Sequence, residues 1–248
     1  LLRGARARHA VLISTIAVYR DPATGPDEDS DDYETALAYG RHRRELEAFV
    51  EDHFEHSLVV RLPALFGRGL RKNFIFDLLN PVPSMLNAEK LSALRGELSR
   101  ELSDWVGHLY CDDPVTGLLK LDRIALCRDA RRGALDAAVA ELGFSATQFH
   151  NRETTYQYYE IGQLWRDIHI ASEAELSHLH CASEPLRAKA IHKRLTGQEM
   201  PETSARLHKE NMHSEHAALW GKSGPYLYGA EETLERLDAF YAGERAPA

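Results

Sequence analysis

The sequence predicts an α/β protein, with part of a doubly wound parallel sheet followed by a mainly helical C-terminal lobe. Two apolar runs, at 9–13 and 57–62, flank a stretch of helical periodicity in which Leu46 and Val50 share one face. Strand, helix and strand in this order form a crossover, which is the repeating unit of a doubly wound sheet. Downstream, leucines recur at spacings of three and four, which favours helices.

The N-terminal region, residues 1–83, is the predicted sheet unit. Leu1 to Arg8 has the composition of the end of a basic helix, and the run His9–Ile13 follows it. We expect this run to be a parallel strand buried on both faces, because it is continuously apolar. An acidic, turn-rich loop from Asp21 to Asp32 comes next, and a helix is expected from about Glu34 to Phe54.

The second strand, Ser57–Leu62, is closed by Pro63 and leads into a basic, glycine-bearing loop at 67–73. A short helix should follow and end near Leu79, because the prolines beyond it cannot continue a helix.

The region 84–248 is predicted to be a helical substrate lobe with late sheet elements at about 147–197. Residues 87–143 have a helical composition throughout, whereas 147–159 is aromatic and extended. The other expected elements are helices at 161–171, from Glu184-Pro185 to Gly197, at 202–218 and at 231–241, and a strand at 176–181.

Composition excludes several classes of protein. The net charge of −8 and the pI near 5.9 argue against a nucleic-acid or anionic-membrane partner. No apolar run approaches the length of a membrane span. The three cysteines have no paired spacing, which indicates reduced thiols and predicts a cytoplasmic protein: Cys111, Cys127 and Cys181.

A possible proton-transfer site begins where the first strand ends. Ser14 and Thr15 follow the apolar run, and Tyr39 and Arg43 lie four residues apart on the helix beyond the acidic loop. A tyrosine exchanges protons near neutral pH only where a nearby cation favours phenolate, and Arg43 could supply that charge. Thr15 could donate a hydrogen bond to a substrate oxygen. The alternative is a surface tyrosine beside a solvated arginine.

Three segments resemble the NAD-dependent epimerase/dehydratase family, the extended short-chain dehydrogenase/reductases. They are Ile13–Tyr19, Tyr39–Arg43 leading to Glu47, and Val60–Pro63 followed by Phe66-Gly67. The resemblance runs from the first strand to about residue 197. It implies a partial Rossmann-type sheet, a nucleotide-linked sugar as substrate, NAD or NADP as cofactor, and a possible homodimer.

The family also implies roles for individual residues. By position, its catalytic strand-end hydroxyl and its Tyr-x-x-x-Lys pair correspond to Thr15, Tyr39 and Arg43. Cofactor contacts are implied for Ser14, Tyr39, Arg43 and Pro63, and substrate contacts for Thr15 and Asn73. In the implied reaction, Tyr39 takes a proton from a sugar hydroxyl as hydride leaves to nicotinamide.

Two departures from the family pattern shape the functional prediction. Arg43 replaces the lysine that holds the nicotinamide ribose, and it differs from lysine in reach and donor geometry. The glycine-rich turn that seats the pyrophosphate is absent from the sequence. We therefore expect no tight NAD binding by this chain alone. Its first methionine is Met85, which suggests a fragment or a truncated reading frame.

These departures leave two alternatives to an NAD(P)-dependent epimerase, dehydratase or reductase. One is a non-catalytic sugar-nucleotide-binding or regulatory protein on the same scaffold, and the other is an inactive truncated fragment. We predict no metal site. His178 and His180 would share one strand face while Cys181 points away, and His213 and His216 on a predicted helix have no third ligand nearby.

Overall fold

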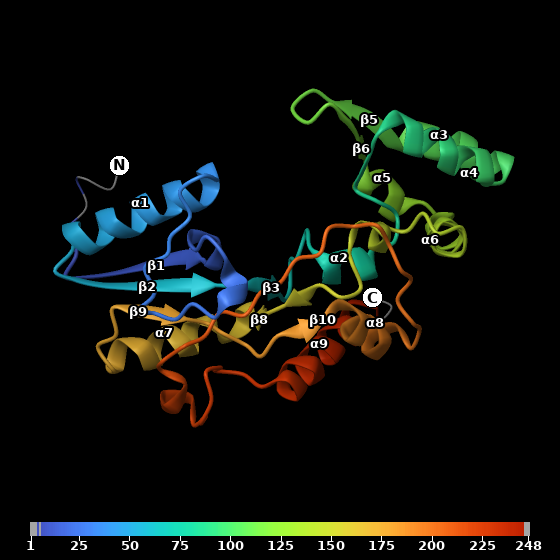
Figure 1. Ribbon diagram of the computed structural model, residues 1–248. Coiled ribbons are helices and arrows are strands. Elements are labelled where there is room, and N and C mark those ends of the chain that lie inside the picture. The colour runs from blue at the N-terminus through green and yellow to red at the C-terminus, as the bar shows by residue number, and fades with distance from the viewer. Residues whose placement is uncertain (1–3, 5, 246–248) are drawn as a thin grey trace. The chain divides into compact units, whose positions relative to one another are not determined.

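The computed structural model describes residue 4 and residues 6–245, which form two compact units (Figure 1). Among the described residues, the sheet unit comprises residue 4 and residues 6–70, 152–200 and 207–245, and the helical unit comprises residues 71–151 and 201–206. This division differs from the expected one at residue 83, because residues 152–200 and most of the C-terminal region belong to the same unit as the first strands. In the predicted basic helix end, residues 1–3 and 5 lie outside the described residues and residues 6–8 are not helical.

A three-stranded parallel sheet is the centre of the sheet unit. Its strands β1 (His9–Thr15), β2 (His56–Leu62) and β9 (His178–His180) are arranged in the order β1-β2-β9. His9 lies opposite His56, and Val59 opposite His178. Helix α1 (Ala38–His53) connects the first two strands, so the predicted crossover is confirmed.

The two faces of the sheet are covered by different helices (Figure 1). Ser14 of β1 contacts α1 through Glu47, whereas β2 packs against α7 (Leu164–Glu173) from the other side. The core on the α7 side is built from Leu58, Val60, Leu62, Tyr159, Ala171, Leu179, Cys181, Leu227 and Tyr228.

Strand β1 is exposed on the face turned away from α1, so the prediction of burial on both faces is wrong. Val11 and Ile13 are 46% and 39% exposed, whereas Ser14 on the opposite face is buried. The reason is the position of the strand: β1 is the outermost strand of the sheet, and α7 packs against β2.

Shorter elements complete the sheet unit. β3 (Ala64–Phe66) pairs with β8 (Tyr158–Glu160), and β7 (Thr155–Tyr156) pairs with β10 (Leu186–Arg187). Helix α8 (Ala188–Thr196) begins later than expected and ends at Gly197, and α9 (Ala230–Arg245) is the last helix. The 3₁₀ turns of this unit are η2 (Ile16–Val18), η3 (Pro22–Thr24), η5 (Ile161–Gln163) and η6 (Ala217–Trp220).

The predicted helix at 202–218 does not form. Within the sheet unit, residues 207–214 are not helical, because several of their backbone groups bond to distant segments instead of to one another. The amides of Asn211 and His213 donate to Pro22 O and Pro26 O, each at 2.8 Å. The buried Gln157 side chain also bonds to both backbone groups of Met212.

The helical unit has its own core. Its elements are α2 (Phe74–Leu79), β4 (Met85–Leu86), α3 (Ala88–Glu97), α4 (Arg100–Leu109), β5 (Tyr110–Asp113), β6 (Leu118–Leu121), α5 (Arg123–Arg128), α6 (Arg132–Glu141) and η4 (Ala146–Phe149). Leu94, Val106, Leu126, Leu135 and Val139 are fully buried in it.

One hairpin interrupts the predicted helical stretch 87–143. Strands β5 and β6 pair antiparallel around a turn in which Gly117 N donates to Asp113 O at 2.9 Å. Gly117 has a φ of +69°, which a side chain would disfavour. The Thr116 hydroxyl also donates to the Asp113 carboxylate at 2.7 Å, so local turn chemistry overrides the helical composition here. Among the described residues, no helix is long and apolar enough to span a membrane.

Candidate active site

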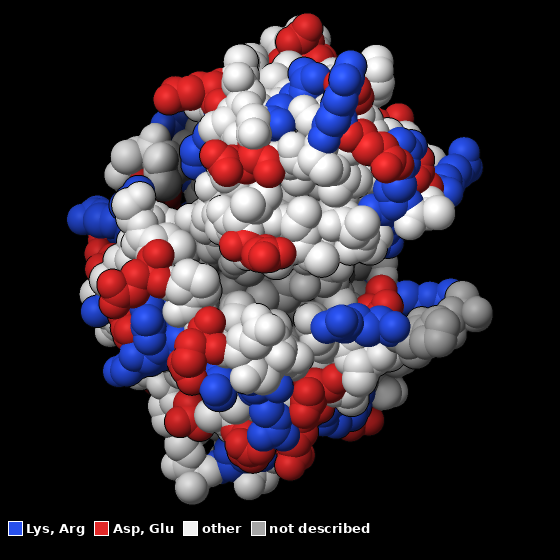
Figure 2. Space-filling view, turned by 90° about the vertical axis from the view of Figure 1, so that its right-hand side faces the viewer, with Lys and Arg blue, Asp and Glu red and all other residues white. Residues whose placement is uncertain are grey.

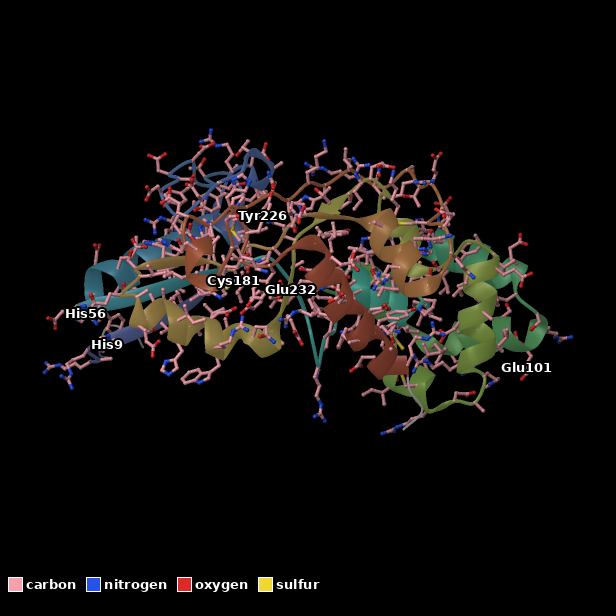
Figure 3. All side chains as sticks on the ribbon, turned by 90° about the horizontal axis from the view of Figure 1, so that it is seen from below. His9, His56, Glu101, Cys181, Tyr226 and Glu232 are labelled. Carbon is pink, nitrogen blue, oxygen red and sulfur yellow. The ribbon has the colours of Figure 1, made fainter. Side chains whose placement is uncertain are left out.

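The predicted proton-transfer residues lie near the carboxyl edge of the parallel sheet. Thr15 ends β1, and Pro63 directly follows β2. Carboxyl ends of parallel strands meet at one edge, which is where α/β proteins bind their ligands. In Figure 3, His9 and His56 mark the opposite, amino ends of these two strands, and Cys181 follows the carboxyl end of β9.

Gly40 brings the helix that carries Tyr39 against the turn that follows Thr15. A Cβ added at Gly40 would lie 2.1 Å from the backbone oxygen of Ala17, a distance that no side chain tolerates. Glycine therefore permits a close approach between the first turn of α1 and the η2 turn. This packing joins the strand-end hydroxyl and the tyrosine in one local structure.

The Thr15 hydroxyl stabilises the turn that it precedes. Its oxygen accepts a hydrogen bond from Ala17 N at 3.3 Å, as a cap of η2. Because the oxygen is the acceptor in this bond, the hydroxyl hydrogen can still be donated to another group.

Tyr39 and Arg43 are neighbours on α1, as their spacing predicts. Tyr39 is 61% exposed, and the Arg43 guanidinium lies 5.9 Å from the centre of its ring. Arg43 Nη1 also donates to Ile13 O at 3.3 Å, which holds the guanidinium near the end of β1. The guanidinium and the ring therefore form a cation–π contact on the surface of α1.

A buried ion pair that was not predicted lies beneath these residues. Glu47 of α1 and Arg61 of β2 both have fully buried side chains. Arg61 Nε donates to Glu47 Oε1 at 3.1 Å and Nη2 donates to Oε2 at 2.9 Å, a two-pronged geometry. The buried Ser14 hydroxyl donates to the same carboxylate, so the side chain assigned to a cofactor contact faces the interior.

The other side of Arg61 contacts neutral groups. Its Nη1 donates to the Tyr19 hydroxyl and, at 3.1 Å, to His180 Nε2. His180 Nδ1 lies 2.8 Å from His213 O, so we assign the ring proton to Nδ1 and the acceptor role to Nε2. Burial, with the Arg61 charge second, lowers the pKa of His180 to about 3 and keeps the ring neutral.

The sequence contained one signal for this network. Arg61 interrupts an otherwise apolar strand, between Val60 and Leu62. A charge inside a buried strand requires a partner, because burial of an unpaired charge is costly. The candidate partner, Glu47, lies one turn beyond Arg43 on the helix.

Asn73 belongs to the helical unit, and its side chain caps a helix. Its Oδ1 accepts from Ile75 N at 3.0 Å and Phe76 N at 3.2 Å, at the start of α2. Asn73 also has a φ of +112°, a backbone conformation that residues other than glycine rarely adopt. Its assignment as a substrate contact stays a prediction.

The histidines considered as metal ligands have other partners in the structure. His178 Nε2 lies 3.1 Å from Glu51, and His180 is part of the buried network around Arg61. His213 lies in the non-helical segment 207–214. Across residue 4 and residues 6–245, no three His, Cys, Asp or Glu side chains are grouped as a metal ion would require. On the face shown in Figure 2, basic and acidic side chains are interspersed.

Known structures share this architecture. A UDP-galactose 4-epimerase aligns with 99% of the chain at a TM-score of 0.55 and 12% identity. The chain has the fold of the sugar-nucleotide epimerases. A UDP-N-acetylglucosamine 4-epimerase from Methanobrevibacter ruminantium, in complex with UDP-N-acetylmuramic acid, aligns with 97% at 0.54 and 10% identity. MoeE5 in complex with UDP-glucuronic acid and NAD aligns with 98% at 0.54 and 14% identity.

These alignments confirm the epimerase fold that the sequence motifs imply. The chain spans 66%, 64% and 67% of the length of those three structures, respectively. No protein-family model and no curated protein matches the sequence.

Proposed function

We propose that this chain contains the catalytic residues of an NAD(P)-dependent, epimerase/dehydratase-like oxidoreductase that acts on a nucleotide-linked sugar. The observation that carries the proposal is the close approach at Gly40, which packs the Tyr39–Arg43 helix against the turn that follows Thr15. This arrangement lies within the epimerase fold, and two of the similar structures contain a UDP-sugar together with NAD.

The residues would divide the proton transfer among them. Tyr39, in its deprotonated form, would accept a proton from a sugar hydroxyl, and the Arg43 guanidinium lies beside its ring. Thr15 donates its hydroxyl hydrogen to the substrate oxygen while its own oxygen remains bonded to Ala17 N.

NAD or NADP would supply the hydride acceptor, and this chain fits only part of such a cofactor. Tyr39, Arg43 and Pro63 could contact the nicotinamide ribose. The sequence has no glycine-rich turn for the pyrophosphate. Gly67 does not replace it, because a Cβ there would lie 2.6 Å from the Ile161 side chain, which indicates a packing role. We therefore expect this chain to bind NAD weakly.

One observation favours a binding-only protein instead. Arg43 Nη1 is bonded to Ile13 O, whereas a catalytic cation must be available to the cofactor ribose. A sugar-nucleotide-binding or regulatory protein would bind a UDP-sugar without turnover, and an inactive fragment would do neither. The cytoplasmic location and the homodimer stay predictions.

Two measurements test the proposal. Calorimetric titration with UDP-glucose tests binding, and chromatography of UDP-glucose and UDP-galactose after incubation with NAD or NADP tests turnover. We expect Tyr39→Phe to abolish turnover and leave UDP-glucose binding intact, because only the ionisable hydroxyl is removed. Unchanged turnover in this variant contradicts the assignment, and binding without turnover in the unaltered chain supports the binding-only protein.

A further inference from the structure

We infer that Glu47 is a positioning residue that sets the separation between the Thr15 hydroxyl and the Tyr39 phenol. The inference rests on the proposed function, since it concerns the geometry of that site. Glu47 itself is fully buried and so has no direct access to a substrate.

One carboxylate joins the three segments that form the site. Through Ser14 it contacts the residue before Thr15, and through Arg61 it contacts the strand that ends before Pro63. Its own helix carries Tyr39 eight residues earlier. A shift of α1 along the sheet would therefore break at least one of these bonds.

The geometry of the pair is fixed from both sides. The two carboxylate oxygens accept from Arg61 Nε and Nη2, at 3.1 and 2.9 Å. Arg61 Nη1 cannot turn away easily, because it donates to Tyr19 and His180. His180 is neutral and hydrogen-bonded, so it holds the guanidinium without competing with Glu47 for its charge.

Because the Glu47–Arg61 pair is buried, it fixes the position of α1 relative to β2. Two ions removed from water are costly unless their hydrogen bonds are well made, so displaced arrangements are strongly disfavoured. The pair Arg41–Glu45 on the same helix provides the contrast. Its ions are 3.9 Å apart and 46% and 65% exposed, so solvent can replace either partner at little cost.

The experiment compares Glu47→Gln, Ser14→Ala and the surface control Glu45→Gln in the full chain, with UDP-glucose and saturating NAD. Gln keeps the shape of Glu47 and removes its charge. Ser14→Ala removes only the attachment to β1, which leaves the buried ion pair in place and protects folding. The melting temperature of each variant, read by circular dichroism, establishes that the assays use folded protein.

We expect kcat to fall by about 10- to 100-fold in Glu47→Gln, the range for an ångström-scale misplacement of a catalytic group. KM for UDP-glucose should be unchanged, because Glu47 does not touch the sugar. Ser14→Ala should lose less kcat, also without a change in KM, and Glu45→Gln should match the unaltered chain. A purely structural role would lower the melting temperature and leave kcat per folded molecule unchanged.

Two results overturn the inference, and they are distinguishable. If the unaltered chain turns over substrate and folded Glu47→Gln and Ser14→Ala retain its kcat, Glu47 does not position the site. If the unaltered chain does not convert UDP-glucose, whether or not it binds it, the proposed function fails and the positioning role fails with it.

Discussion

Removing one member of the Glu47–Arg61 pair should destabilise the sheet unit far more than removing both. In Glu47→Met, the Arg61 guanidinium stays fully buried, and its contacts with Tyr19, Tyr33 and His180 supply no counter-charge. A buried charge left without its partner costs about 3–5 kcal/mol. This is a large part of the roughly 5–15 kcal/mol that stabilises an ordinary domain.

The double variant Glu47→Met/Arg61→Met removes both charges together. Apolar replacement of a whole buried pair is often neutral. Four side chains each lose a partner here, however, at about 1 kcal/mol: Ser14, Tyr19, Arg44 and His180. We therefore expect the double variant to be more stable than the sum of the single changes predicts, by at least about 2 kcal/mol.

Urea unfolding measures this difference. Trp165 and Trp220 belong to the sheet unit and Trp105 to the helical unit, so fluorescence of a Trp105→Phe background follows the sheet unit alone. The matched control is the exposed pair Arg41–Glu45, for which the same cycle should give about 0.5 kcal/mol or less. Additive effects of the Glu47 and Arg61 changes, within about 0.5 kcal/mol, would refute the reasoning.

Three further predictions follow from the site. Arg43→Lys should strengthen NAD-dependent turnover, because a lysine releases the Ile13 carbonyl and matches the family residue. The control Arg41→Lys should leave turnover unchanged. Unchanged kcat in both variants would favour the binding-only protein. Gly40→Ala should destabilise the fold by about 1–3 kcal/mol in urea unfolding, since its Cβ would lie 2.1 Å from a backbone oxygen. The control Gly96→Ala in α3 should be stabilising, because a Cβ at Gly96 would have no atom within 4 Å. The folded-state pKa of His180 is depressed to about 3 from 6.5, so its contribution to stability is complete above pH 6.5 and is lost as the pH falls towards 3. His180→Gln should therefore flatten the dependence of the urea midpoint on pH in this window. Identical slopes for the variant and the unaltered chain would contradict the burial argument.

The parts of the fold that the sequence predicted depend on local periodicity. The crossover from β1 through α1 to β2 follows from apolar spacing, and the shared face of Tyr39 and Arg43 follows from their separation of four residues on a helix. Gly197 also ends α8 where the sequence placed the end of that helix.

The parts that were missed depend on distant partners. Residues 207–214 lie in a stretch of helical composition, but several of their backbone groups are bonded to Pro22, Pro26 and Gln157, which no local pattern reveals. The exposure of Val11 likewise depends on which neighbours β1 has across the sheet. Ser14 could be placed at the end of a strand from the sequence, but the direction of its hydroxyl depends on Glu47, on another element.

The outer edge of β1 has a consequence for the behaviour of the protein in solution. Among the described residues β1 pairs only with β2, so one row of its backbone amides and carbonyls points away from the sheet. Such an edge is a template on which another extended chain can add by hydrogen bonding, and Val11 and Ile13 beside it supply apolar area. The sheet is therefore open to growth by one strand, and the same property makes self-association at high concentration a practical concern for any preparation of the protein.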